Sequence, residues 1–316
     1  MKPSLEAAVA AAADAVESRR ERIGKDEPRF ELFHAPNSIC SQKVRTVLAH
    51  HGTPYVSHSM DLFAGQTYLP AYVRLRMIGC ERLGGPLVSA HTGSTSVSAG
   101  GCDPAVVPTL VDREAGDVLV DSKRICLYLD ELAGSLLRPP RLASKIDAEI
   151  TVVDNLPNYQ MLSGRPPGED LRPPSQRGKT GVEFAMSKVG RCDRYLAEFA
   201  DDAVLVRAYS AKRAKEQMAA DRLFSAEAMR ATYDKAEAAC VDLDRALAKR
   251  GTRWLLDDEV TLADLYWALE FVRMKNLGAQ AFWTSGTRPA LAAYAERCEA
   301  IPAVRSAVIE WPGALF

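Results

Sequence analysis

Hydrophobic and polar positions follow two different patterns along the chain. Near the start, the apolar runs Phe30–His34 and Tyr55–Met60 flank a helical pattern at Ser41–His51, which predicts a β-α-β unit with parallel strands. Beyond Arg141 the alternation typical of strands is absent. Helices are predicted there over residues 143–163, 180–200, 208–249, 261–276 and 288–309. The pattern therefore predicts an α/β N-terminal domain followed by an all-α C-terminal domain.

A β-hairpin and a helix complete the first predicted domain. The run Val106–Val111 contains a proline, and a turn then leads into Val118–Val120. A central strand rejects proline, so we expect either a cis bond at Pro108 or a strand at the edge of the sheet. Asp121 and Ser122 begin the next helix. They either cap it or bind an anion or amine, because a helix N-terminus serves both purposes.

Three segments connect or extend these domains. Residues 1–28 are rich in alanine and then in charge, which predicts an accessory helix closed by Gly24 and Pro28. Residues 79–101 are rich in glycine, serine and threonine and predict an inserted loop, a suitable rim for a binding cleft. The predicted units are a helical extension at 1–28, an α/β domain at 29–137 with the insert, and an all-α domain at 141–316 after the linker Pro139-Pro140.

Composition narrows the function classes. The 316 residues are 47% hydrophobic, enough for packed cores, and 40 basic against 41 acidic residues give a net charge of -1. No global field therefore favours nucleic acid or an anionic membrane. No apolar run approaches the roughly 18 residues of a membrane span, and acidic residues interrupt the alanine-rich start, unlike a signal peptide. We expect a soluble, unexported protein.

The seven cysteines are odd in number, widely spaced and form no C-x-x-C pair. This pattern argues against a disulfide framework or a zinc ribbon and favours a reducing cytoplasm. Cys80, His91 and Cys102 all fall in the predicted insert. A metal site or a disulfide is conceivable there, but the spacing matches no compact ligand pair, so we expect no metal.

Cys40 stands at a position that suits a reactive thiol. Residues 37–45 predict a loop that runs into a helix, which places Cys40 in the first helical turn. Unpaired N–H groups and the positive end of the helix dipole favour a thiolate there, and Lys43 lies on the same helical face. The alternative is that Cys40 is a small buried residue that only packs.

The order of these parts resembles the soluble glutathione transferases, whose first domain is thioredoxin-like. The shared parts are the cysteine-bearing loop, Val107-Pro108, Asp121-Ser122, and Thr261-Leu262-Ala263-Asp264, which also has the spacing of a capping box. Within that superfamily, Ser38-x-Cys40-Ser41-x-x-Val44-Arg45 is similar to the zeta class. Dispersed segments in both domains are more similar still to the glutathione-dependent reductive dehalogenases of chlorinated hydroquinones. They include Tyr72-Val73-Arg74-Leu75-Arg76, Ile125-Cys126-Leu127-Tyr128-Leu129 and Trp311-Pro312-Gly313-Ala314.

The resemblance, which covers residues 28–316, implies a glutathione site on the first domain. Pro108 would be cis and would expose the Val107 backbone to the cysteinyl part of glutathione. Asp121 and Ser122 would hold the γ-glutamyl end. Glutathione is thus the expected co-substrate.

The resemblance also implies the reacting groups. Ser38 or its neighbouring amides would stabilise the glutathione thiolate, and Cys40 would be the redox thiol. The chain departs from tyrosine-type transferases because His34, and no tyrosine, lies near the end of the first strand. It departs from thioredoxins because Lys43 occupies the place of a second cysteine, so a mixed disulfide of Cys40 with glutathione replaces an internal one.

A halogenated aromatic substrate would lie between the domains. We expect Asn158 and Tyr159 on a helix, and Arg165 and Arg172 on a proline-rich loop, to face it. A homodimer is also expected. Two alternatives stay open: the same fold and co-substrate used for β-aryl ether cleavage or cis–trans isomerisation, and a non-catalytic scaffold with the transferase fold.

Overall fold

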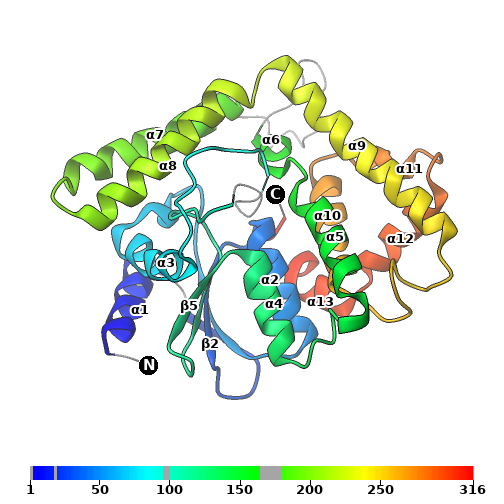
Figure 1. The fold of residues 1–316 in the computed structure, drawn as a ribbon, viewed down its shortest axis with the longest axis horizontal. Coiled ribbons are helices and arrows are strands. Elements are labelled where there is room, and N and C mark those ends of the chain that lie inside the picture. Colours follow the sequence, from blue (N-terminus) through cyan, green and yellow to red (C-terminus); the bar gives the residue numbers. More distant parts are fainter. Residues whose placement is uncertain (1–2, 18–19, 95–99, 164–179, 316) are drawn as a thin grey trace.

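A five-stranded mixed sheet forms the first part of the chain. The computed structural model describes residues 3–17, 20–94, 100–163 and 180–315 (Figure 1). The strands are β1 (Arg20–Ile23), β2 (Phe30–His34), β3 (Tyr55–Ser59), β4 (Thr109–Asp112) and β5 (Asp117–Val120), in the order β1-β3-β2-β4-β5. Only β2 and β3 pair in parallel within this sheet; β1 with β3, β2 with β4, and β4 with β5 are antiparallel. The predicted β-α-β unit and hairpin are confirmed.

Helices cover both faces of the sheet because strand side chains alternate between its two sides. Leu32 and Leu110 point toward α2 (Ile39–His50) and α4 (Ser122–Leu132), whereas Phe33, Val111 and Val120 point toward α1 (Pro3–Ala15) and α3 (Pro70–Leu83). Figure 1 shows the two helix pairs on opposite sides of the strands. The sheet thus separates two hydrophobic cores.

The rest of the chain is helical, as predicted. Its elements are η3 (Pro140–Leu142), α5 (Ala143–Asp154), α6 (Asn158–Ser163), α7 (Gly181–Glu198), α8 (Ala203–Arg222), α9 (Ala226–Lys249), α10 (Leu262–Asn276), α11 (Ala281–Thr284), α12 (Pro289–Glu299), α13 (Pro302–Val304) and the π-helical turn η5 (Arg305–Ile309). Helices α5, α9, α10 and α12 share the core beneath α2 and α4, while α7 and α8 pack on the core of α1 and α3. The predicted capping box is present at the start of α10, where the Asp264 carboxylate accepts from the Thr261 backbone N–H.

Three predicted boundaries were wrong. The helix expected over 1–28 ends at Ala15, and β1 follows it because Arg20–Ile23 extends the sheet along the edge of β3. The helix expected over 143–163 is broken before α6, and the one expected over 208–249 is two helices, α8 and α9. Local signals accompany both breaks, since Pro157 precedes α6 and the Ser225 hydroxyl caps α9 by accepting from the Ala228 amide.

The insert begins later than predicted, since α3 continues to Leu83. At Gly79 the helix packs so closely on β5 that a Cβ atom would lie 2.6 Å from Val120 Cγ1 and 2.9 Å from the Val118 carbonyl oxygen. Glycine at this position therefore serves close packing and does not mark a loop. A short 3-10 turn, η1 (Gln66–Tyr68), precedes α3.

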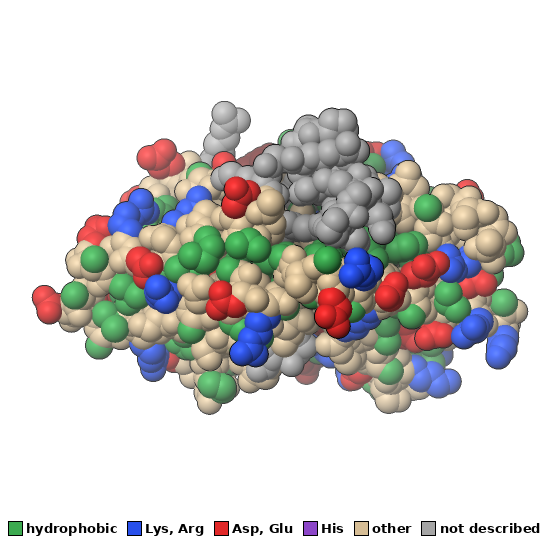
Figure 2. Space-filling view, turned by 90° about the horizontal axis from the view of Figure 1, so that it is seen from above, with side chains coloured by type: hydrophobic (Ala, Val, Ile, Leu, Met, Phe, Trp, Pro, Cys, Tyr) green, Lys and Arg blue, Asp and Glu red, His purple; other side chains and the backbone are tan. Residues whose placement is uncertain are grey.

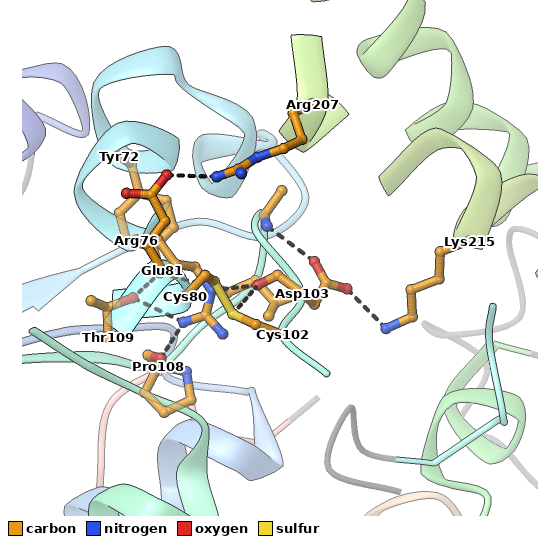
Figure 3. The surroundings of a disulfide bond; sticks show 12 residues. Tyr72, Arg76, Cys80, Glu81, Cys102, Asp103, Pro108, Thr109, Arg207 and Lys215 are labelled. Atoms are coloured by element: carbon orange, nitrogen blue, oxygen red, sulfur yellow. Dashed lines mark hydrogen bonds and ion pairs between the residues drawn. A yellow bond between two sulfur atoms is a disulfide. The ribbon is translucent and has the colours of Figure 1, made fainter. Parts of the chain in front are cut away.

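A disulfide joins Cys80 on α3 to Cys102, with their Cα atoms 5.6 Å apart (Figure 3). The sequence left a disulfide in the insert open, and the structure forms one, because the folded chain brings together residues that are 22 positions apart. The bond ties α3 to the segment that leads into β4. The five other cysteines are free.

Charges of both signs are mixed on the face shown in Figure 2, where Lys and Arg are interspersed with Asp and Glu. Hydrophobic side chains gather in a band across the middle of the same face. Among the described residues, no helix is long and apolar enough to cross a membrane. The tail from Trp311 packs back on the first domain: Arg45 lies over the Trp311 ring, and Gln42 donates to the Ala314 carbonyl at 3.0 Å.

Candidate functional site

Three segments that the sequence singled out meet at one edge of the sheet. Phe33 of β2 pairs with Thr109 of β4, and Thr109 pairs with Val120 of β5. Because both pairs are antiparallel, the end of β2, the start of β4 and the end of β5 lie side by side. The start of α2, the Val107-Pro108 bond and the start of α4 therefore converge there.

Cys40 is the second residue of α2, in the first turn as predicted, and it is partly exposed. Ser38 is the N-cap, and its hydroxyl accepts a hydrogen bond from the Ser41 amide at 3.4 Å. The Ser41 hydroxyl in turn accepts from the Ala35 amide at 3.2 Å, which fixes the loop after β2. Ser122, at the start of α4, is near enough to the Cys40 thiol that its hydroxyl lowers the pKa of the thiol. The thiol is thus held between two helix N-termini.

Burial raises the pKa of Cys40 above its ordinary value. The positive charge of Lys43 and the Ser122 hydroxyl lower the pKa, while the Asp154 and Asp121 carboxylates raise it. Burial outweighs the favourable groups, since it disfavours the charged thiolate. The expectation of a lowered pKa is therefore wrong for the protein without ligand, although the expected contribution of Lys43 is present.

Lys43 is buried and pairs across the two domains. Its Nζ lies 2.6 Å from Oδ1 of Asp154 on α5 and 4.4 Å from the ring centroid of Tyr266 on α10. Burial lowers its pKa, but the attraction of Asp154 and Cys40 leaves the pKa raised overall, so the ammonium is charged. The residue at the place of a second thioredoxin cysteine is thus a fixed cation one helical turn from Cys40.

A second buried acid and base lie beside this pair. Glu270 on α10 is fully buried, and its Oε2 accepts from Asn158 Nδ2 of α6 at 2.9 Å. Burial raises the pKa of Glu270, while Asn158, Lys43 and Arg273 oppose that rise. Arg273, one turn further along α10, donates to the Asn37 carbonyl at 2.6 Å. The helical domain thereby holds the loop that precedes Cys40.

The Val107-Pro108 bond is cis, as the resemblance implied. Arg76 of α3 holds this segment from both ends: Nε donates to the Asp103 carbonyl at 2.6 Å, and Nη1 donates to the Pro108 carbonyl and, at 2.9 Å, to the Thr109 hydroxyl (Figure 3). Within the described residues the Val107 backbone makes no hydrogen bond of its own. Its amide and carbonyl are therefore available to a ligand.

Asp121 caps α4, which was one of the two predicted roles. Its Oδ1 accepts from the Arg124 amide at 3.2 Å, and its backbone has a φ of 81°. Burial raises the pKa of Asp121, with a further increase from the Asp154 carboxylate. Ser122 is buried beside Cys40. The cap and the ligand-binding role are compatible, since the N-terminal amides of α4 face the same edge.

Tyr159 points away from the Asn158 cluster into another polar cluster. Its hydroxyl donates to Oε2 of Glu216 at 2.9 Å, its ring stacks on His91 with centroids 4.2 Å apart, and Lys188 Nζ lies 4.3 Å from the ring centroid. Burial lowers the pKa of His91 to about 2, so this imidazole is neutral. The insert, α6, α7 and α8 meet at this cluster, so Tyr159 is packed among them.

The remaining candidates divide in two groups. Arg165 and Arg172 lie outside the described residues. His34 is fully buried between Ser57, 2.8 Å from its Nε2, and Arg45, 3.1 Å from its Nδ1. Burial lowers the pKa of His34 well below its ordinary value, so it supports the strand end and does not activate a thiol. Within the described part of the chain, no group of three or more His, Cys, Asp or Glu side chains suits a metal ion.

Sequence reasoning missed the partners that arrive from the helical domain. Asp154, Glu270 and Arg273 are more than 100 residues from Cys40 in sequence, and no spacing rule connects them. For Arg76 the sequence offered only the similarity of the segment Tyr72–Arg76 to the dehalogenases. Its location on a helix that precedes a cis-proline segment was the one signal available.

The mixed sheet flanked by helices, followed by a helical region, is the thioredoxin-like arrangement that the sequence predicted. The model of the glutathione S-transferase N-terminal domain matches residues 37–132. Two 2,5-dichlorohydroquinone reductive dechlorinases from strains of Sphingobium indicum are each 41% identical over 293 residues, which is 91% of this chain and 84% of theirs. The chain therefore belongs to the glutathione S-transferase family, and it is an enzyme whose co-substrate is glutathione.

Solved structures share the fold at low sequence identity. Beta-etherase LigF from Sphingobium sp. strain SYK-6 is 15% identical with a TM-score of 0.57, covering 88% of this chain and 98% of its own. A zeta-class maleyl pyruvate isomerase is 19% identical with a TM-score of 0.51, covering 90% of this chain and 99% of its own. These likenesses support the expected fold class.

Proposed function

We propose that this enzyme reductively dehalogenates a chlorinated hydroquinone at the expense of glutathione. The observation that carries the proposal is Cys40, a partly exposed thiol in the first turn of α2. The relatives that match across 91% of the chain bear the name of this reaction, and the substrate class follows from that name.

Glutathione would lie along the edge where α2, β4 and α4 begin. The Val107 amide and carbonyl would pair with its cysteinyl part, and Asp121 and Ser122 would hold the γ-glutamyl end. Ser38 and the first amides of α2 would stabilise the glutathione thiolate, as helix N-termini do for anions. Arg76 would position this site without touching the ligand, because it holds the segment on either side of Val107.

The first step is a substitution at carbon. The glutathione thiolate attacks the chlorine-bearing carbon of the keto tautomer of the hydroquinone. The carbon–chlorine bond breaks, its electron pair leaves with chloride, and an S-aryl conjugate forms.

The reducing step belongs to Cys40. Its thiolate attacks the sulfur of the conjugate. The bond between that sulfur and the ring carbon breaks, its electron pair passes to the ring, and the ring carbon takes up a proton. Cys40 is then disulfide-linked to glutathione, and a second glutathione displaces it by exchange. In sum, one aryl chloride and two glutathiones give the dechlorinated hydroquinone, glutathione disulfide and HCl.

The charges around Cys40 suit this step. Lys43 and Arg273 place two cations beside a thiol that must ionise, and Asp154 neutralises one of them. Burial raises the pKa of Glu270, which disfavours a further negative charge beside the thiolate. The aromatic ring would lie between the domains, near Asn158 and Tyr159.

Replacing Cys40 with Ser tests the proposal against the other reactions of this fold. A dehalogenase should stall at the S-aryl glutathione conjugate, which should accumulate in place of the dechlorinated hydroquinone. An isomerase or an ether-cleaving enzyme needs no cysteine redox step. If Cys40→Ser forms the dechlorinated hydroquinone at most of the original rate, the proposal is contradicted. A scaffold would show no glutathione binding at millimolar concentration by calorimetry.

We further propose a cytoplasmic homodimer. A reducing compartment supplies the glutathione that the reaction consumes and keeps Cys40 free, while burial shields the Cys80–Cys102 disulfide from reduction. Light scattering combined with size-exclusion chromatography measures the oligomeric state directly.

We also propose the division of the chain into a glutathione-binding unit at 29–137 and a substrate-binding unit at 141–316.

A further inference from the structure

A buried cluster of charged side chains joins three parts of the chain. Asp103 lies in the segment before β4, Lys212 and Glu216 lie one turn apart on α8, and Tyr159 belongs to α6. Asp103, Lys212 and Glu216 are each no more than 2% exposed. Charges so far from water persist only when they are paired and hydrogen-bonded, so the contacts within this cluster fix how the three parts are arranged.

Asp103 holds the segment that leads to the cis bond. Its Oδ2 lies 2.8 Å from Nζ of Lys212 and 2.8 Å from Nζ of Lys215, both on α8. Its carbonyl oxygen accepts the hydrogen bond from Arg76 of α3 (Figure 3). Helices α3 and α8 therefore hold the same residue, which precedes Val107 by four positions.

Lys212 extends this contact into the helical domain. Its Nζ also lies 2.8 Å from Oε1 of Glu216, so one ammonium lies between two carboxylates. The other oxygen of Glu216, Oε2, accepts from the Tyr159 hydroxyl at 2.9 Å. A continuous chain of side-chain contacts thus runs from the segment before Val107, through Lys212, to the helix that begins at Asn158.

The charged members of this chain of contacts are ionised. Burial alone would favour their neutral forms. The Asp103 and Glu216 carboxylates nevertheless leave the pKa of Lys212 raised. Lys212 and Lys215 leave the pKa of Asp103 well below its ordinary value. Lys188 and Lys212 likewise lower the pKa of Glu216. Hydrogen bonds between ionised groups are shorter and stronger than those between neutral groups, so Lys212 holds both of its partners in place.

Both ends of the chain of contacts lie at a proposed ligand site. The Val107 backbone makes no hydrogen bond within the described residues, so the contacts on either side of it set its position. The position of Asn158 follows from that of Tyr159, since the two residues are consecutive at the start of α6. A site that is held in place before binding loses less free energy to ordering, so its ligand binds more tightly.

We propose that Lys212 is a positioning residue for both binding sites, acting on the glutathione site through Asp103 and on the aromatic-substrate site through Glu216. It touches neither ligand. By holding these two carboxylates, it sets the distance between Val107 and Asn158, and thus how closely the two reactants approach. The inference rests on the function proposed above, because it assumes those two ligands.

Calorimetry without oxygen tests this role with two probes that do not react together. S-methylglutathione has no free thiol, and 2,5-dichlorohydroquinone is then added to the protein that S-methylglutathione saturates. We expect Lys212→Met to weaken the binding of both probes by about tenfold, the contribution of one charge-assisted hydrogen bond. Steady-state kinetics should show both KM values raised with little change in kcat, because Lys212→Met leaves Cys40 and its neighbours in place.

Lys215→Met is the matched control. Lys215 is also buried on α8 and lies at the same 2.8 Å from Asp103, so this variant loosens the same carboxylate but leaves Lys212 between its two partners. It should weaken the binding of S-methylglutathione and leave the affinity for the hydroquinone unchanged. Glu216→Gln should do the reverse, because the amide offers one oxygen where Lys212 and Tyr159 use two. Urea unfolding shows which variants fold, and these two opposite effects test the role by themselves if Lys212→Met does not.

Equal affinities of the original protein and Lys212→Met for both probes would overturn the inference and leave the proposed function intact. A loss of hydroquinone affinity in Lys215→Met as large as that in Lys212→Met would also overturn it, since a general loss of packing would then explain both. The same holds if Lys215→Met and Glu216→Gln affect both probes alike. An original protein that does not bind both probes would contradict the proposed function and, with it, this inference.

Discussion

Lys43 and Asp154 should move the pKa of Cys40 in opposite directions. Removing the cation in Lys43→Met withdraws an attraction for the thiolate, so the pKa of Cys40 should rise. Removing the carboxylate in Asp154→Asn withdraws a repulsion, so the pKa should fall. Both side chains are buried, where salt screens charges weakly.

The size of the effect follows from the helix geometry. Residues three apart on a helix have Cβ atoms about 5–6 Å apart, and an opposite charge at this range shifts a pKa by about 1–3 pH units. Asp154 lies 2.6 Å from Lys43 and cancels part of its field, so we expect the low end, about one pH unit in each direction. Breaking a buried ion pair also costs about 3–5 kcal/mol of stability, so both variants should unfold at lower urea concentration.

The assay is the rate of Cys40 alkylation by iodoacetamide along a pH series, followed by mass spectrometry of the peptide that contains Cys40. The other free cysteines are buried and should react slowly. Lys123→Met is the matched control, because Lys123 contacts Thr151 at the surface of α4 and should leave the profile unchanged. The pH midpoint of Cys40 alkylation should move up in Lys43→Met and down in Asp154→Asn. Midpoints that move in the same direction, or that do not move, would refute the electrostatic account of this thiol.

Three further variants test the surroundings of the site. Arg76→Met should raise the KM for glutathione about tenfold with little change in kcat, whereas Arg74→Met, an exposed neighbour, should change neither in steady-state kinetics. Cys80→Ser combined with Cys102→Ser should lower the free energy of unfolding by about 3 kcal/mol in urea titrations, and an unchanged midpoint would contradict the structural role of the disulfide. Glu270→Gln should match the original protein at acidic pH and become the more stable of the two as the pH rises, because a carboxyl with a raised folded-state pKa loses stability above its unfolded pKa of about 4.3. Equal urea midpoints at alkaline pH would show that Glu270 carries no such cost.

Local patterns were sufficient for the parts of the fold whose signals lie close together in sequence. The strand β2, the helix start at Ser38, the hairpin after Pro108 and the Asp121 cap each depend on neighbours within a few residues. The strand at Arg20–Ile23 could not be predicted this way, since its stability comes from pairing with β3 and its side chains are mostly exposed.

The site shows the same division. The sequence placed Cys40 in the first turn of a helix, but it could not show that burial would raise the pKa of the thiol. It counted Lys43 as a nearby charge, but its partner Asp154 comes from another domain. The Cys80–Cys102 bond was likewise set by the packing of α3 against the segment before β4. Burial and long-range pairing are tertiary properties, so residue spacing does not encode them.

The central claim is that Cys40 carries the reducing step through a mixed disulfide with glutathione. The most direct measurement is mass spectrometry of the enzyme, quenched with acid during turnover with glutathione and 2,5-dichlorohydroquinone. The account predicts one glutathione linked by a disulfide to the peptide that contains Cys40, and no such adduct when the hydroquinone is omitted under reducing conditions. Chloride release at the full rate without a glutathione adduct on Cys40 would contradict it.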